Sequence, residues 1–505
     1  MDGCVHGHLF TGNERHTVKR MRIAERPDGK AVRSTLCIFF MFGTMDPAAA
    51  QVGPNHEGGN DGYRVQCNSA APRAAIVACT RIIDDKREDS DGRMMALQNR
   101  GYYYQAIGDL DHSIADYTTV LQFSAGRSAK SKIYLNLGVL YAQKGDQSNA
   151  LNNYGEALNL DPKLASAYIN RAAILLKRQD EDQALADLDR AVLLTPKDPE
   201  IYISRGSVYA HSGDQDRAIA DFSKSIALNP TNALAWRDRG FAYRNKGNPA
   251  KAIADATEAI RLDPNVARAH LDLGLSLQAT GDVKRALVEF GEAIALDPSD
   301  ARAFKARGDA YATEGNQDSG IADFSRAIAL DPRITGAYTN RGVAYMAKSE
   351  WSRAIPDFSQ AIALEPSLSA AYLNRGQALR ASGYTDRAIA DFDRAIRIQP
   401  DAIQAYLQRA FLRQKSGDNS GAVEDYNHVI ALNPADAEAL RGRGYARLNQ
   451  HEYDRAVEDL TAAIALNPKD ALAFRFRSSA YTAKKEPNRA HNDDVKARQL
   501  DPSAR

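Results

Sequence analysis

The sequence contains few of the features that mark enzymes, metal sites or nucleic-acid-binding proteins. Its 505 residues include only four cysteines, and lysine plus arginine exceed aspartate plus glutamate by one, so the net charge is +1. This balance, together with the lack of basic runs, argues against nonspecific nucleic-acid binding. Zinc-protease, nucleophile-elbow, phosphate-loop and paired CxxC motifs are missing, and the histidines are scattered. The sequence therefore predicts a protein that is not an enzyme and needs no cofactor or metal.

What the chain does contain is a repeat of fixed length. Between Ser369 and Pro400, two helix-length segments each place small or apolar residues at a helical spacing, so each helix has one face to bury. We expect the two helices to form an antiparallel hairpin. The residues on the two faces are Tyr372, Gly376, Leu379, Ala388, Phe392 and Ala395.

The proline that closes this unit recurs every 34 residues without a slip. A fixed period of this length indicates a repeat architecture, whose core grows with each unit rather than dividing into globular domains. The prolines are Pro162, Pro196, Pro230, Pro264, Pro298, Pro332, Pro366, Pro400, Pro434, Pro468 and Pro502.

Counted from the start of each unit, an aromatic or Leu at place 4, small residues at places 8, 20 and 27, and Pro at place 32 resemble the tetratricopeptide repeat. The resemblance covers about four fifths of the chain. It implies an all-α solenoid of stacked hairpins that winds into a right-handed superhelix, with the first helices lining an inner groove. We expect residues 94–505 to form it, in twelve units that begin near Met94, Ser131, Ala165, Pro199, Ala233, Ala267, Ala301, Thr335, Ser369, Ile403, Ala437 and Ala471.

Residues 1–50 are predicted to be a leader. Basic residues precede the apolar run Leu36–Phe42, and a small-residue cleavage site ending at Ala50 follows. This order is typical of a secretory signal, and the apolar run is too short to span a bilayer. We therefore expect export to the periplasm, with translation starting at Met1 or Met21; the alternative is a disordered tail on a cytoplasmic protein.

Residues 51–66 are rich in Gly and Asn and have no periodicity, which is typical of a linker. Residues 67–93 are expected to form an N-terminal helical segment around the helix Pro72–Ile83. In an oxidising compartment, Cys67 in the loop before this helix and Cys79 within it are candidates for a disulfide. Two free buried thiols are the alternative.

Arginine at place 7 and aspartate at place 23 of a unit are either both present or both absent. Ten units have both, whereas the other two have Leu137 with Asn153 and Leu273 with Glu289. We predict an ion pair that links the two helices of each hairpin and has an architectural role. The predicted pairs are Arg100 with Asp116, Arg171 with Asp187, Arg205 with Asp221, Arg239 with Asp255, Arg307 with Asp323, Arg341 with Asp357, Arg375 with Asp391, Arg409 with Asp425, Arg443 with Asp459, and Arg477 with Asp493.

The resemblance implies that groove residues lie at places 2, 5, 6, 9, 12 and 13 of the first helices. Place 6 is rich in side-chain amides, which can donate to and accept from a peptide backbone whatever the side chains of the peptide. This row resembles the asparagine ladder in the repeat arm of O-GlcNAc transferases; the alternative is that Asn and Asp simply tolerate solvent there. Place 6 holds Asn99, Asn136, Asn170, Ser204, Asp238, Asp272, Asn340, Asn374 and Gln408.

Around this row the predicted groove changes character along the chain. It has an early apolar part, a basic centre that Asp238, Asp272 and Asp309 interrupt, and a late apolar part. This pattern suits a peptide with hydrophobic anchors on either side of an acidic segment, although some of the apolar residues must pack between repeats. The early residues are Leu135, Val139, Ile169 and Ile203; the central ones are Arg237, Arg244, Arg268, Arg302 and Lys305; the late ones are Val343, Met346, Leu373, Leu407 and Phe411.

We therefore predict a non-catalytic scaffold that binds an extended peptide or protein partner in its groove. Neither nucleic acid nor a membrane is an expected partner once the leader is removed. Two alternatives remain open: a recognition subunit of a multi-protein envelope enzyme or secretion complex, and a structural or oligomeric spacer.

Overall fold

The computed structural model describes residues 61–69, 71–123 and 126–501, and within these ranges every regular element is an α-helix. This is the predicted all-α class. The leader predicted for residues 1–50 and the linker up to residue 60 lie outside the described residues.

The helices follow one another as hairpins in chain order, and short turns connect them. In the described part of the chain they are α1 (Asp61–Ser69), α2 (Pro72–Asp84), α3 (Ser90–Ala106), α4 (Leu110–Val120), α5 (Arg127–Lys144), α6 (Gln147–Leu160), α7 (Ala165–Lys177), α8 (Glu181–Leu194), α9 (Pro199–His211), α10 (Gln215–Leu228), α11 (Ala233–Asn245), α12 (Pro249–Leu262), α13 (Ala267–Ala279), α14 (Val283–Leu296), α15 (Ala301–Thr313), α16 (Gln317–Leu330), α17 (Thr335–Ala347), α18 (Trp351–Leu364), α19 (Ser369–Ala381), α20 (Thr385–Ile398), α21 (Ile403–Lys415), α22 (Asn419–Leu432), α23 (Ala437–Asn449), α24 (Tyr453–Leu466), α25 (Ala471–Ala483) and α26 (Pro487–Leu500).

Helix starts follow the period of the sequence. From Ala165 to Ala471, the first helix of each repeat begins at the residue where the period places the unit start. In the first two repeats the helix begins four residues earlier, at Ser90 and at Arg127. Asp89 explains the early start of α3, because its carboxylate accepts a hydrogen bond from the Gly92 amide and caps the helix.

The linker prediction is wrong for residues 61–66. Helix α1 begins at Asp61, and Cys67 lies within this helix rather than in a loop. The helix escaped prediction because it has no repeating apolar face: Cys67 is its one buried apolar residue. Helix α1 pairs with α2, so a degenerate hairpin precedes the twelve regular ones.

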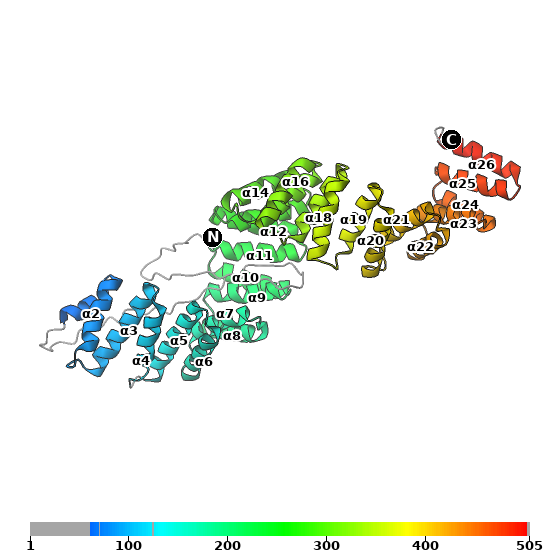
Figure 1. The fold of residues 1–505 in the computed structure, drawn as a ribbon. Coiled ribbons are helices and arrows are strands. Elements are labelled where there is room, and N and C mark those ends of the chain that lie inside the picture. The colour runs from blue at the N-terminus through cyan, green and yellow to red at the C-terminus, as the bar shows by residue number, and fades with distance from the viewer. Residues whose placement is uncertain (1–60, 70, 124–125, 502–505) are drawn as a thin grey trace. The chain divides into compact units, whose positions relative to one another are not determined.

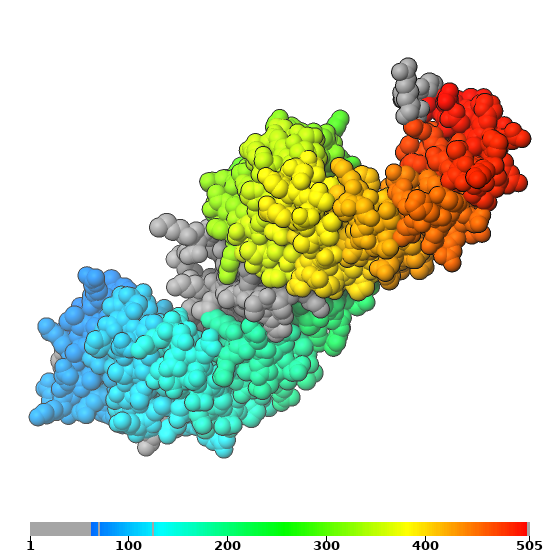
Figure 2. Space-filling view, turned by 45° about the vertical axis from the view of Figure 1, so that its right-hand side comes forward, coloured from blue at the N-terminus to red at the C-terminus, as the bar shows by residue number. Residues whose placement is uncertain are grey.

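The chain divides into two compact units, residues 1–280 and residues 281–505. Helices α1–α13 belong to the first unit, and α14–α26 belong to the second. Within each unit, every helix packs against the next helix in the chain (Figure 1). In the space-filling view, side chains of neighbouring repeats meet along each unit (Figure 2). Each unit is therefore a stack whose core is shared between successive hairpins.

Within each compact unit, the core of a repeat lies between its two helices. In repeat nine, Ala388, Phe392 and Ala395 of α20 are completely buried. Gly376 of α19 lies against the Phe392 ring so closely that a Cβ atom there would be 2.6 Å from Cε1 of Phe392. The predicted interior face is confirmed, and the glycine is required because it leaves room for the aromatic ring of the second helix.

Candidate functional site

All ten predicted arginine–aspartate pairs are present. In repeat nine, Arg375 donates hydrogen bonds from Nε and Nη2 to the two carboxylate oxygens of Asp391, each at 2.8 Å. The other nine pairs have the same two-pronged geometry, with distances from 2.5 to 3.0 Å. The hydrogen bond with Asp391 raises the pKa of the Arg375 guanidinium. Each pair thus joins the two helices of one hairpin by a charge-assisted contact.

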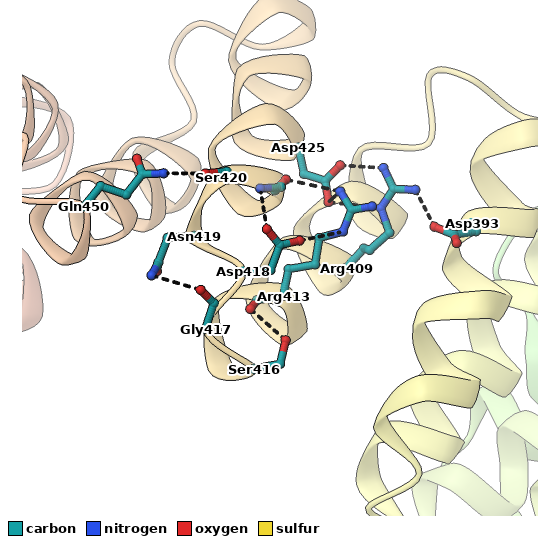
Figure 3. A network of polar contacts seen from close by, with 11 residues as sticks. Asp393, Arg409, Arg413, Ser416, Gly417, Asp418, Asn419, Ser420, Asp425 and Gln450 are labelled. Atoms are coloured by element: carbon teal, nitrogen blue, oxygen red, sulfur yellow. Dashed lines mark hydrogen bonds and ion pairs between the residues drawn. The ribbon is translucent and has the colours of Figure 1, made fainter.

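Eight of these ten arginines also reach back to a residue before their own repeat, a contact not predicted from the sequence. Nη1 of Arg375 donates to the Ser359 hydroxyl at 3.1 Å, and Nη1 of Arg409 donates to the Asp393 carboxylate at 2.5 Å. Figure 3 shows Arg409 held between Asp425 of its own repeat and Asp393 of the repeat before it. The acceptors of this third contact are Thr80 on α2 and, at place 25 of the regular repeats, Asp189, Ser223, Ser325, Ser359, Asp393, Asn427 and Thr461.

A signal for this third contact was present in the sequence. Each acceptor at place 25 stands sixteen residues before its arginine. The two repeats that lack the arginine–aspartate pair have Gly155 and Gly291 at place 25, so the arginine that follows each of them has no side chain to bond there. Place 25 escaped prediction because Asp, Ser, Asn and Thr all occur there, and only their ability to accept a hydrogen bond is shared.

In the second unit, α15 and α17 form a pocket of about 310 Å³ on the first-helix face. Asp309 lies at its polar side, where its carboxylate accepts hydrogen bonds from Asn340 Nδ2 at 2.6 Å and from Lys305 Nζ at 2.7 Å. Val343 at its apolar side is 45% exposed. The remaining lining residues are Ala312, Thr313, Gln317, Phe324, Ala344 and Ala347. The pocket therefore combines hydrogen-bonding groups with accessible apolar surface.

The side-chain amides of the predicted row have different environments. Asn99 donates to Asn68 of α1 at 2.5 Å, and Asn170 is completely buried. Asn136 and Asn374 are partly exposed, and neither makes a side-chain hydrogen bond to another described residue. Gln408 is also partly exposed, although its Oε1 atom is buried without a hydrogen-bond partner. Within the described residues, Asn136 and Asn374 remain available to a ligand, whereas the buried carbonyl oxygen of Gln408 does not.

The predicted basic centre of the groove needs correction. Each of its five cations lies beside an aspartate of the same compact unit. The aspartates neutralise the positive charge, which is therefore not left for an acidic ligand. Asp238, Asp272 and Asp309, which interrupt the basic centre in the sequence, pair with four of the five cations, and Asp300, the N-cap residue of α15, pairs with Arg302. The contacts are Arg237 with Asp238 at 2.5 Å, Arg244 and Arg268 with Asp272 at 3.3 and 3.6 Å, Arg302 with Asp300 at 2.6 Å, and Lys305 with Asp309 at 2.7 Å.

The early apolar residues also need correction, because they pack in the core. Leu135, Val139 and Ile169 belong to one buried cluster with residues of their own and neighbouring hairpins, and Ile203 belongs to the next cluster along the chain. Their burial between repeats explains their apolar character without any ligand.

The late apolar residues are only partly used in packing. Leu407 is buried, and Met346 and Leu373 are partly buried. Val343 and Phe411 are 45% and 48% exposed. In the second unit, exposed apolar side chains and side-chain amides thus occur on the same set of first helices.

Comparisons with known families agree with this architecture. Family models described as tetratricopeptide repeat or TPR repeat match residues 138–179, 171–235, 233–266, 271–333, 339–403, 407–471 and 443–493. Together these matches cover most of the chain. The chain belongs to the tetratricopeptide repeat family.

Similarity to individual tetratricopeptide repeat proteins is partial. The photosystem I assembly proteins Ycf3 of Rippkaea orientalis and Acaryochloris marina are 31% and 36% identical over 67 and 73 residues, which are 13% and 14% of this chain. These matches span 39% and 40% of the two relatives. Among solved structures, a tetratricopeptide repeat protein of Parabacteroides merdae is 20% identical, with a TM-score of 0.43 over 50% of this chain and 99% of its own. YrrB, described as a TPR protein with an unusual peptide-binding site, is 26% identical, with a TM-score of 0.31 over 36% of this chain and 95% of its own.

Proteins of the tetratricopeptide repeat family generally bind proteins or peptides and act as non-catalytic scaffolds, and this family membership favours an interaction role. In the part of the chain that the structure describes, no cluster of His, Cys, Asp and Glu could hold a metal ion. Within the same residues, no helix combines the length and the apolar character that a membrane span requires.

Proposed function

We propose that this protein is a scaffold that holds an extended peptide segment of a partner protein against the first helices of its second unit. The observation that supports this most strongly is the pocket between α15 and α17, because it places the Asp309–Asn340 pair next to the exposed side chain of Val343. An extended peptide offers backbone N–H and C=O groups to such polar side chains and an apolar side chain to the hydrophobic wall.

Further along the second unit, Asn374 and Gln408 offer amides, and Phe411 offers an exposed ring over which Arg380 lies at 5.4 Å. These groups continue the same combination of polar and apolar contacts on the first helices α19 and α21. We propose that the peptide has neutral polar and apolar side chains, since Lys305, the cation of α15 beside Asp309 of the pocket, is already paired with that aspartate.

The proposal predicts that peptides selected from a displayed random library on the full chain lose affinity when Val343 is replaced by Lys. We expect a loss of at least about tenfold, because the charged side chain would have to be desolvated against the bound peptide. Binding is measured by fluorescence anisotropy. Val495→Lys is the matched control, because Val495 is 39% exposed on α26, a second helix.

Equal losses in the two variants, or none in either, would contradict groove binding. If the library yields no binder at all, a structural or oligomeric spacer would become the better interpretation. Copurification of a catalytic chain with the full-length protein would instead favour the recognition subunit of an enzyme or secretion complex.

We further propose that the protein is exported and that residues 1–50 are its leader. The order of basic, apolar and small-residue parts in this segment supports export, and a disulfide between Cys67 and Cys79 is the kind of bond that persists in an oxidising compartment. N-terminal sequencing of the protein purified from its native cells should begin at Gln51. A chain that retains residues before Gln51 in the cytoplasmic fraction would refute this localisation.

A further inference from the structure

Helix α1 buries little apolar surface of its own. Cys67 is 2% exposed and Tyr63 is partly buried, whereas Arg64 and Gln66 are exposed. A helix of nine residues is not stable in isolation, so α1 depends on its contacts with α2 and α3. These contacts decide whether the helix stays in place.

The non-covalent contacts between α1 and its neighbours include several polar ones. Arg64 pairs with Glu88 at 2.6 Å, Tyr63 accepts a hydrogen bond from Arg81, whose guanidinium lies over the Tyr63 ring, and Asn68 accepts one from Asn99. The Arg64 side chain is 46% exposed, so solvent competes for its guanidinium, whereas the Glu88 side chain is buried. The covalent bond between Cys67 and Cys79 is the attachment of α1 to α2 that a reductant can remove.

Beneath α1 lies the apolar end of the solenoid. Ala78, Cys79 and Ile82 of α2 and Ala96 of α3 form one buried cluster with Cys67. Asn99, at place 6 of the first repeat, also faces α1, where Asn68 occupies its amide. Displacing α1 would therefore expose an apolar patch and free an amide of the first repeat at the same time.

We propose that the Cys67–Cys79 bond is a redox-controlled latch, and that its reduction releases α1 and opens the N-terminal end of the solenoid around Asn99. In the oxidised protein α1 covers this end. In the reduced protein the remaining non-covalent contacts let α1 detach, and the cluster and the Asn99 amide become accessible to solvent.

The reduction balances with a dithiol as the electron donor. A thiolate of the dithiol attacks one sulfur of the pair and releases the other cysteine as a thiolate, which takes up a proton. The second thiolate of the dithiol then closes its own disulfide and releases the second cysteine. The reductant loses two electrons and the two cysteines gain them. Because Cys67 and Cys79 are buried, the attack requires a local fluctuation that exposes one sulfur while the bond still holds α1 on α2.

Hydrogen–deuterium exchange of the full chain, with and without dithiothreitol, tests the latch. On reduction, we expect amides of residues 61–69 to exchange roughly tenfold faster or more, with a smaller increase at residues 75–82 and 95–100 and no change beyond the second repeat. Cys67→Ser should show the fast exchange in both conditions. The matched control, Cys4→Ser with Cys37→Ser, should keep the response to dithiothreitol.

Two results would overturn the latch. One is equal protection of residues 61–69 in the oxidised and reduced chains, which would mean that the polar contacts alone hold α1. The other is a count of two free thiols at Cys67 and Cys79 in protein purified without reductant, because then no bond exists to be reduced. Neither result depends on whether a peptide binds in the second unit.

Discussion

Replacing Asp391 by Asn while Arg375 stays in place should lower the free energy of local unfolding of repeat nine by about 3 kcal/mol. The Asp391 side chain is 9% exposed and the Arg375 side chain 22%, so little water reaches the pair. Asn keeps one acceptor oxygen but places an NH2 group against the guanidinium, so Arg375 loses its counter-charge and one hydrogen bond while it remains largely buried. Native-state hydrogen exchange of amides in α19 and α20 measures the change, and it suits a solenoid because repeats can open separately.

The chain itself supplies the control for this prediction. Repeat two has Leu137 and Asn153 at the same two places and still forms the closely packed hairpin of α5 and α6. Arg375→Leu combined with Asp391→Asn should therefore be within about 1 kcal/mol of the parent, because no charge is left buried without its partner. If the double variant is as unstable as Asp391→Asn alone, the pair contributes through something other than charge neutralisation.

Much of this fold could be predicted because the same packing of two helices recurs in every repeat. Small and large apolar residues recur at the places of Gly376 and Phe392 in the repeats. The interior faces could therefore be identified from the 34-residue period. Arg375 and Asp391 could be paired because both change together in the two exceptional repeats. Helix α1 could not be found in this way, since polar contacts and a disulfide hold it, and a single segment offers no repetition to compare.

The candidate site was harder to predict than the fold, because the ion pairs of surface residues depend on neighbouring side chains that differ from repeat to repeat. Lys305 is on the expected helix face, but Asp309 one turn later neutralises it, and Asn340 of the next repeat shares the same carboxylate. The position of a cation in the repeat could not show whether it is unpaired and available to a ligand or already paired with an aspartate. The prediction that the early apolar residues line the groove was wrong for a related reason. Ile169 lies at a groove place, but its side chain packs in the core between hairpins.

Replacing Phe392 by Ala should lower the free energy of local unfolding of repeat nine by about 4 kcal/mol, a larger loss than the one expected for Asp391→Asn. Phe392 is completely buried, and the residue opposite it is Gly376, which has no side chain that could fill the space left by the ring. The cavity would lie between α19 and α20, so both helices should lose protection in native-state hydrogen exchange while distant repeats keep theirs.

The same geometry predicts a compensating pair. Gly376→Ala alone should cost about 2 kcal/mol, because its Cβ would lie 2.6 Å from the Phe392 ring and the ring would have to shift. Repeat three solves this problem with Ala172 opposite Leu188, both buried. Gly376→Ala combined with Phe392→Leu should therefore be more stable than Gly376→Ala alone, although it also removes part of a buried ring. If the combination is less stable than either single change, the fit between residue 376 and residue 392 does not set the distance between the two helices.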